Sequence, residues 1–260
     1  MPQKIICFDL DGTLIDDQGI IHPADIEILA SHRGSLLIPA TGRTIRSVRQ
    51  LFEKNGLFIG QLLPFPLVLL NGAALYTQGE HLLAYFHFEY DLQTKLIQLL
   101  VPFHQAGMLF FDLNEVYTLH ENGFVKEVLT SLNFRAQSFS KSNHSHELCK
   151  VMCLSDNPEI LEAVSNSINP LAVETSYSLS YALEISPLGV NKANAILQLV
   201  NILGVDDYLL YAVGDGENDL PMLNLANFSY SPITAPDHIR TKVDYAIDAS
   251  VNGILAPMLG

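Results

Sequence analysis

The sequence has no tryptophan and only three cysteines among its 260 residues. An odd and low count of cysteines predicts no disulfide framework and favours a reducing cytoplasm. No charged leader followed by a long apolar core precedes the first predicted strand, so we expect no secretory signal. We therefore expect a cytoplasmic protein.

Basic residues are scarce as well: Lys and Arg number 14 against 28 Asp and Glu, which gives a formal net charge of −14. So acidic a surface repels nucleic acids and anionic membranes, and we expect neither as a partner. Long apolar runs are also missing. The longest stretch in the first third, Leu62 to Leu70, is interrupted by two prolines and is too short to span a bilayer. We expect a monomer or a weak homodimer.

Apolar residues make up 48% of the chain and charged residues 16%, which is enough for a sizeable core. Buried-strand patterns and helical spacings alternate in the first and last parts of the chain, and this alternation predicts a parallel sheet with helices on both faces. The predicted strands are 4–8, 35–40, 67–70, 208–213 and 245–247. The predicted helices are 23–32, 44–54, 191–203 and 218–225.

The middle of the chain has a mixed order of elements. Residues 82–88 and 110–119 have the pattern of antiparallel hairpins, 92–104 and 158–168 that of helices, and 148–154 and 181–185 that of strands. We predict an inserted α+β domain over 73–186, between two core segments at 1–72 and 187–260, with hinges near Asn71-Gly72 and Pro187 to Gly189.

Two carboxylates follow the first predicted strand, in the string Asp9-Leu10-Asp11-Gly12-Thr13. Both can face the crevice beyond the strand if the chain curls there, and Gly12 permits such a curl. One carboxylate can act as a nucleophile and the other as a general acid and base. The competing interpretation is a turn in which an aspartate caps a helix.

The second strand leads into Ala40-Thr41-Gly42-Arg43. A hydroxyl and backbone N–H groups at a strand-to-helix turn suit a phosphate oxygen, so Thr41 and Gly42 are candidate phosphate-binding residues. Thr41 as the N-cap of the next helix explains the pattern equally well.

Two further patterns lie in the last third of the chain. Lys192 lies at a predicted helix start, where its charge meets the positive end of the helix dipole unless an anion is bound there. The alternative is an exposed surface lysine. Asp215 and Asp219 flank a helix start four residues apart, within reach of one divalent ion such as Mg²⁺, which takes oxygen ligands. The alternative is an acidic cluster that serves only the helix dipole.

In this order the four patterns resemble the motifs of the haloacid dehalogenase superfamily. The large insertion lies between the second and third motifs, as in members with a C2-type cap, and the stretches Asn71-Gly72 and 182–192 resemble the Cof-type branch with its C2B cap. The resemblance implies an α/β fold with a doubly wound parallel-sheet, Rossmann-like core and an inserted α+β cap. It covers both core segments, and the cap only by position and length.

The resemblance also implies a magnesium-dependent phosphatase of small phosphorylated metabolites, with sugar phosphates as the first substrate class. Asp9 would attack phosphorus and form a phosphoaspartate, while Asp11 would protonate the leaving oxygen and then activate water. The residues implied to hold the phosphoryl group are Thr41, Gly42, Lys192 and Asn218. Those implied to hold the metal are Asp9, Asp11 through its backbone carbonyl, Asp215, and Asp219 in a supporting role.

Other interpretations stay open at this point. A sugar phosphomutase has the same four motifs, and a catalytically idle sensor of a phosphorylated ligand would keep the binding residues, although the intact Asp9 and Asp11 argue against it. The branch commonly has Asn where Thr234 stands, which bears on substrate range more than on reaction type. The set His144, His146, Cys149 and Cys153 fits no closed zinc spacing, and we expect no soft-metal site there.

Overall fold

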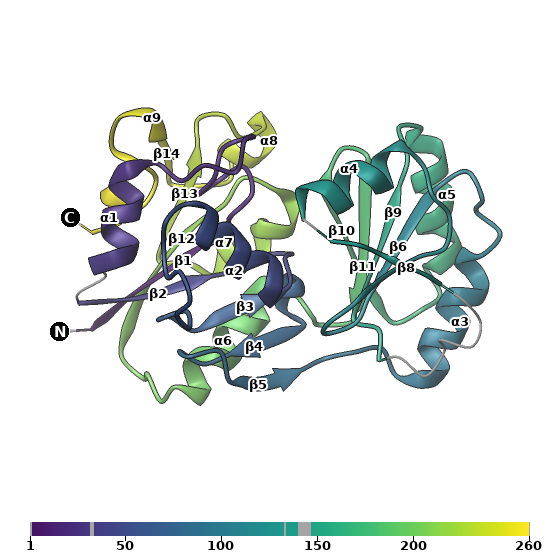
Figure 1. The fold of residues 1–260 in the computed structure, drawn as a ribbon, viewed down its shortest axis with the longest axis horizontal. Helices are drawn as coiled ribbons and strands as arrows, with labels where there is room; N and C mark the ends of the chain where they lie inside the picture. Colours follow the sequence, from purple (N-terminus) through teal and green to yellow (C-terminus); the bar gives the residue numbers. More distant parts are fainter. Residues whose placement is uncertain (1, 32–33, 133, 140–146, 260) are drawn as a thin grey trace. The chain divides into compact units, whose positions relative to one another are not determined.

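The computed structural model describes residues 2–31, 34–132, 134–139 and 147–259. The chain divides into two compact units, Met1–Ala84 with Asn191–Gly260, and Tyr85–Val190 (Figure 1). The second unit thus begins later than the insert predicted from residue 73. The physical reason is that β4 (Ala74–Tyr76) pairs antiparallel with β3 (Leu67–Leu69) in a small sheet that belongs to the first unit.

The first unit contains a five-stranded sheet in which all strand pairs are parallel, in the order β14-β13-β12-β1-β2. Its strands are β1 (Gln3–Phe8), β2 (Ser35–Pro39), β12 (Tyr208–Val213), β13 (Phe228–Pro232) and β14 (Tyr245–Ile247). The interior strand β1, between β12 and β2, is buried on both faces, which explains its unbroken apolar run from Ile5 to Phe8. This confirms the parallel α/β core expected from the sequence.

Helices follow most of these strands, as the alternation in sequence predicts. They are α1 (Pro23–Ser31), α2 (Ile45–Lys54), α6 (Lys192–Ile202), α7 (Leu220–Leu225), α8 (Asp237–Arg240) and α9 (Ala249–Asn252). The predicted helix 218–225 instead begins as a 3-10 turn, Glu217–Asp219, before it continues as α7. A small sheet of β3, β4 and β5 (Leu82–Tyr85) completes the described part of this unit.

The second unit is a six-stranded sheet with helices, which confirms the α+β insert. Its strand order is β10-β11-β9-β6-β7-β8, and neighbouring strands pair antiparallel except β7 and β8, which are parallel. The strands are β6 (Gly107–Phe111), β7 (Val116–Thr118), β8 (Gln137–Ser138), β9 (Lys150–Leu154), β10 (Val173–Leu179) and β11 (Ala182–Pro187). The helices are α3 (Tyr90–Leu100), α4 (Gly123–Ser131) and α5 (Pro158–Ile168).

Two predictions for this unit have clear outcomes. The hairpin at 110–119 is confirmed, because β6 and β7 pair antiparallel with Leu109 opposite Thr118. The helix predicted over 92–104 ends at Leu100, because Pro102 cannot continue the hydrogen-bond ladder of a helix.

Candidate active site

Neighbouring parallel strands end together at one edge of the sheet in the first unit. β1 leads into Asp9, whose backbone N–H donates to the carbonyl of Val213 at 3.0 Å. β12 leads into Gly214, whose N–H donates to the carbonyl of Tyr230 at 3.2 Å. The carboxylates of Asp9 and Asp215 are therefore placed at the same carboxyl edge, where open α/β sheets bind ligands.

Lys192 is the first residue of α6 and its side chain is fully buried. Its Nζ lies 2.6 Å from Asp9 Oδ1 and 2.5 Å from Asp219 Oδ1. The interpretation of Lys192 as an exposed surface lysine is therefore wrong. The lysine instead joins the strand-end carboxylate to the loop after β12, two segments that are far apart in the chain.

The loop after β12 is fixed by its own aspartates. Asp219 Oδ2 accepts the backbone N–H groups of Asp215 and Gly216, each at 3.0 Å. Asp215 Oδ1 in turn accepts the hydroxyl of Thr13 at 2.7 Å. Gly12 has φ +76°, and a Cβ there would lie 2.3 Å from Asp215 Oδ2. The glycine of the first motif is thus required both for its backbone conformation and for the space that Asp215 occupies.

Thr41 is fully buried in the turn between β2 and α2, and Gly42 follows it. Thr41 Oγ1 accepts the backbone N–H of Arg43 at 3.2 Å. The N-cap of α2 is Thr44, whose hydroxyl accepts the N–H of Ser47. The alternative role of Thr41 as the helix cap is therefore wrong, and the turn has a threonine that the helix does not need.

The turn Leu70–Gly72 ties the second and fourth motifs together. Leu70 and Asn71 both have left-handed backbones, with φ of 53° and 57°, which are unfavourable for a branched residue such as leucine. Their N–H groups donate to the carbonyls of Arg43 and Thr41 at 3.1 and 3.0 Å. Asn71 Oδ1 accepts the amide of Asn218 at 3.4 Å. Backbone strain held in place in this way is common at functional sites.

Sequence reasoning missed the roles of two buried residues, Arg43 and Asn71. Arg43 donates from Nε and Nη2 to both oxygens of Asp11, at 2.8 and 2.6 Å. For Asn71 the sequence predicts only a turn with Gly72. The place of Arg43 in the second motif could have marked it as a site residue. Its pairing with Asp11 could not have been predicted, because no sequence spacing relates the two residues.

Carboxylates outnumber cations among the side chains brought together here. Full ionisation would leave two uncompensated negative charges, since four carboxylates meet two cationic groups. The carboxylates are Asp9, Asp11, Asp215 and Asp219, and the cations are Lys192 and Arg43. This excess of negative charge is what a divalent cation would neutralise.

The excess appears in the pKa values of the buried groups. Burial raises the pKa of Asp9 well above its ordinary value, and neighbouring carboxylates add to the shift while Lys192 opposes it. Burial and the charge of Asp219 raise the pKa of Asp215 to about 6. Burial alone would lower the pKa of Lys192, but Asp219 and Asp9 more than offset burial and raise it. The site thus holds a strongly charged lysine beside carboxylates that are hard to ionise without a cation.

The donor set fits a hard metal ion. Among the residues that the structure describes, Asp9, Asp215 and Asp219 each offer a carboxylate oxygen, and these atoms lie within 4.8 Å of one another. Oxygen ligands of this kind suit Mg²⁺ and not a soft metal. The arrangement can therefore hold a divalent cation next to a buried carboxylate that is paired with a lysine.

The soft-metal alternative gains no support. Cys149 and Cys153 are fully buried, and burial raises the pKa of both thiols to about 12. His144 and His146 lie outside the described residues.

Every helix in the described part of the chain is too short or too polar to span a bilayer.

Comparisons with known proteins identify relatives of this chain. A family profile described as haloacid dehalogenase-like hydrolase matches residues 6–256. A putative phosphatase of Bacillus subtilis is 28% identical over 235 residues, which cover 86% of this chain and 84% of that protein. A 5-amino-6-(5-phospho-D-ribitylamino)uracil phosphatase of the same organism is 23% identical over 280 residues, which cover 96% of this chain and 95% of that protein.

A similar fold is found among solved structures. The structure of a sugar phosphatase of haloacid dehalogenase subclass IIB superposes with a TM-score of 0.77 at 21% identity, and the match covers 94% of this chain and 92% of the other. The likeness extends over both units, because a match to the core alone would leave the insert uncovered.

Proposed function

The chain belongs to the haloacid dehalogenase-like hydrolases of the Cof type, and from this premise we propose that it hydrolyses phosphomonoesters of small metabolites. Sugar phosphates are the substrate class that we propose. Support comes from the relatives, which include phosphatases, one of them for a phosphoribityl compound, and from a neighbouring structure of a sugar phosphatase.

Asp9 is the nucleophile in this proposal. One of its oxygens attacks phosphorus, the bond from phosphorus to the leaving oxygen breaks, and a phosphoaspartate forms. Asp11 gives its proton to the leaving oxygen. A water molecule then attacks the phosphoaspartate while Asp11 takes a proton back, and inorganic phosphate and the regenerated Asp9 carboxylate result.

Binding roles follow from position. Lys192 is charged and buried, so it can hold Asp9 in place and compensate charge on the transferred group. Thr41, Gly42 and Asn218 are assigned to phosphoryl oxygens. Asp9, Asp215 and the backbone carbonyl of Asp11 would hold Mg²⁺, with Asp219 as support, and the ion would supply positive charge for the transferred phosphoryl group. The inserted unit remains our prediction for the part that selects among substrates.

One observation carries this proposal most directly: a fully buried lysine is paired with Asp9, and carboxylate oxygens of Asp9, Asp215 and Asp219 lie within 4.8 Å of one another. Four carboxylates, those of Asp9, Asp11, Asp215 and Asp219, meet only two cationic side chains there, and a bound cation would neutralise this excess. A metal-dependent phosphatase needs this excess of negative charge, because the excess attracts a divalent cation and the bound cation in turn attracts the anionic substrate.

The test is a phosphate-release screen over a panel of sugar phosphates, nucleotides and cofactor phosphates, with and without Mg²⁺. We expect Mg²⁺-dependent release that is strongest among the sugar phosphates and is lost in Asp9→Asn. Release by Asp9→Asn at the wild-type rate would refute the assignment of the nucleophile. Absence of release from every member by a folded protein would refute the phosphatase.

A further inference from the structure

Arg43 and Asp11 form a two-point ion pair in the first unit. The guanidinium donates from Nε to Asp11 Oδ2 at 2.8 Å and from Nη2 to Asp11 Oδ1 at 2.6 Å. The two side chains differ sharply in exposure, with relative accessibilities of 8% for Arg43 and 53% for Asp11. A buried, fixed cation thus holds a carboxylate that faces solvent.

The arginine is itself fixed from several directions. Its backbone N–H donates to Thr41 Oγ1 at 3.2 Å, and its carbonyl accepts the N–H of Leu70 at 3.1 Å. Its Nη1 donates to the hydroxyl of Ser47 at 2.8 Å, in the first turn of α2. The cap residue Thr44 fixes that turn. The backbone of Arg43 is therefore held by Thr41 and by the turn at Leu70, and its guanidinium is held by Ser47 at the start of α2.

Because the guanidinium is planar and contacts both oxygens, it sets the rotation of the Asp11 carboxylate as well as its position. A half-exposed aspartate without such a partner would sample several rotamers. A proton donor must lie within hydrogen-bonding reach of the leaving oxygen, so rotation away from that oxygen removes the benefit of acid catalysis.

We propose that Arg43 is the positioning residue for the acid–base group Asp11, and that it speeds the step in which a poor leaving group departs. This inference rests on the phosphatase proposed above and extends it to a residue that acts only through Asp11. A purely structural arginine would support the turn but would not distinguish one leaving group from another.

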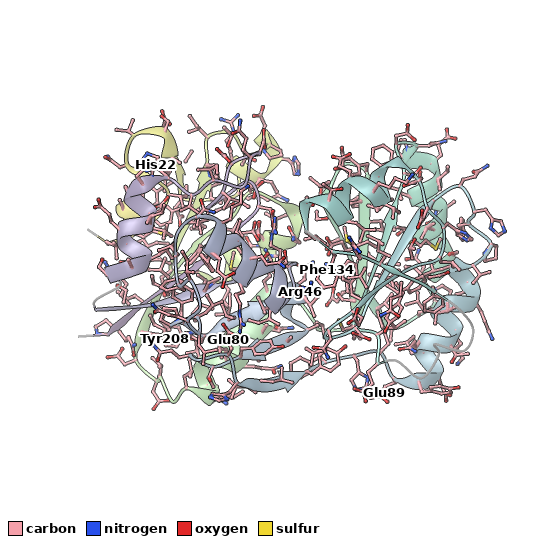
Figure 2. The ribbon with its side chains drawn as sticks, viewed as in Figure 1. His22, Arg46, Glu80, Glu89, Phe134 and Tyr208 are labelled. Carbon is pink, nitrogen blue, oxygen red and sulfur yellow. The ribbon has the colours of Figure 1, made fainter. Side chains whose placement is uncertain are left out.

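The test compares Arg43→Lys with the matched change Arg49→Lys. Arg49 lies on α2 and pairs with the carboxylate of Glu80 (labelled in Figure 2), outside the candidate site. Lysine keeps the charge in both variants but offers a single point of contact in place of the fork. Rapid-mix kinetics follow formation of the phosphoenzyme from p-nitrophenyl phosphate and from the sugar phosphate that the wild type hydrolyses fastest.

For Arg43→Lys we expect phosphoenzyme formation from the sugar phosphate to slow on the order of 10²-fold, the size of effect that a misplaced catalytic group produces. With p-nitrophenyl phosphate, whose leaving group needs no proton, we expect a change of less than about threefold, since acid catalysis contributes little there. Arg49→Lys should match the wild type on both substrates. Equal slowing on both substrates, or no slowing on either, would overturn the proposal.

Failure of the phosphatase itself is seen separately, as absence of phosphate release by the wild type. In that event the ion pair is still tested by NMR of the arginine Nε–H groups. Slow solvent exchange of the Arg43 Nε–H that becomes fast in Asp11→Ala supports the fixed pairing. An exchange rate equal to that of an exposed arginine in the wild type would overturn it.

Discussion

Lys192 Nζ lies 2.6 Å from Asp9 Oδ1, although 183 residues separate the two in the chain. The contact joins the first strand of the parallel sheet to a helix that follows the inserted unit. Since both side chains are buried, neither charge is stable without the other. The pair therefore requires that the two core segments fold together before the candidate site exists.

Lys192→Met should abolish phosphate release and lower stability, because it leaves two carboxylates buried without their cation. Breaking a buried ion pair from one side costs about 3–5 kcal/mol. Mg²⁺ should raise the melting temperature of this variant more than that of the wild type, since the ion then meets an even larger negative excess. Thermal unfolding with Mg²⁺ and with EDTA checks this.

The control is Lys4→Met, because Lys4 bonds the carbonyl of Met258 outside the site. It should release phosphate at the wild-type rate. An Mg²⁺ response of Lys192→Met no larger than that of the wild type would contradict the electrostatic account of the site.

Gly12→Ala should impair Mg²⁺ binding and activity, because the new Cβ would overlap the carboxylate of Asp215. Gly56→Ala is its matched control: φ is +75° there and +76° at Gly12, but nothing lies within 4 Å of a Cβ at Gly56. Each change costs about 1–2 kcal/mol for a left-handed residue that is not glycine. Titration of Mg²⁺ by calorimetry distinguishes the two, and equal Mg²⁺ affinity in both variants would refute the role given to the space at Gly12.

Much of the core could be predicted from the sequence, because its strands are continuous apolar runs that end in polar motifs. The run from Ile5 to Phe8 predicts a buried strand, and the aspartates that follow it must lie at the sheet edge. The sequence places Lys192 in the site only through the resemblance of its surroundings to a family motif, because a lysine at a helix start can equally well be exposed. The pairing of Arg43 with Asp11 is a tertiary contact, and nothing in the local pattern specifies it.

Several elements are absent from the prediction, and for β13, β10 and α4 the physical reason is clear. β13 has Ser229, Ser231 and Pro232 in place of an apolar run, although all three are buried. β10 is rich in serine and threonine and is only partly buried, so it lacks a clear alternation. α4 begins with Gly123, a poor helix former, and its start depends on the cap made by Asn122.

In the metal-free protein, the raised pKa of Asp215 makes stability depend on pH. A carboxyl whose pKa rises on folding holds its proton more tightly in the folded state than in the unfolded state. Its contribution to the stability of the fold is therefore fully present below the ordinary pKa of 3.8, and is lost as the pH rises through the folded-state pKa of about 6. In EDTA at pH 7.5, Asp215→Asn should therefore melt at a higher temperature than the wild type, and the difference should shrink near pH 4.5.

Mg²⁺ should reverse this order, because it stabilises the wild type and has lost a ligand in Asp215→Asn. Melting curves at both pH values, with and without Mg²⁺, give all four comparisons. A variant that is less stable than the wild type in EDTA at pH 7.5 would show that the negative excess does not destabilise the site.

Asp25 offers a test of stability separate from activity. Its buried carboxylate accepts the backbone N–H groups of Ile254 and Leu255, each at 2.9 Å, and so ties α1 to the C-terminal segment. Asp25→Ala leaves both N–H groups unpaired, at a cost of about 1–3 kcal/mol for each. We expect a lower melting temperature with unchanged phosphate release per folded molecule. A wild-type melting temperature would mean that water replaces the carboxylate at no cost.

The central claim is that Asp9 carries the phosphoryl group and Asp11 moves the proton. It is tested most directly by rapid-mix kinetics of Asp11→Asn with p-nitrophenyl phosphate, with acid-quenched samples digested to locate the phosphate. We predict a burst of nitrophenolate equal to the enzyme concentration, slow turnover afterwards, and phosphate bound covalently at Asp9. General acid and base catalysis typically contributes on the order of 10²–10⁴-fold, so the slow phase should be reduced by that order. No burst, with no phosphate on Asp9 at any time, would contradict the account.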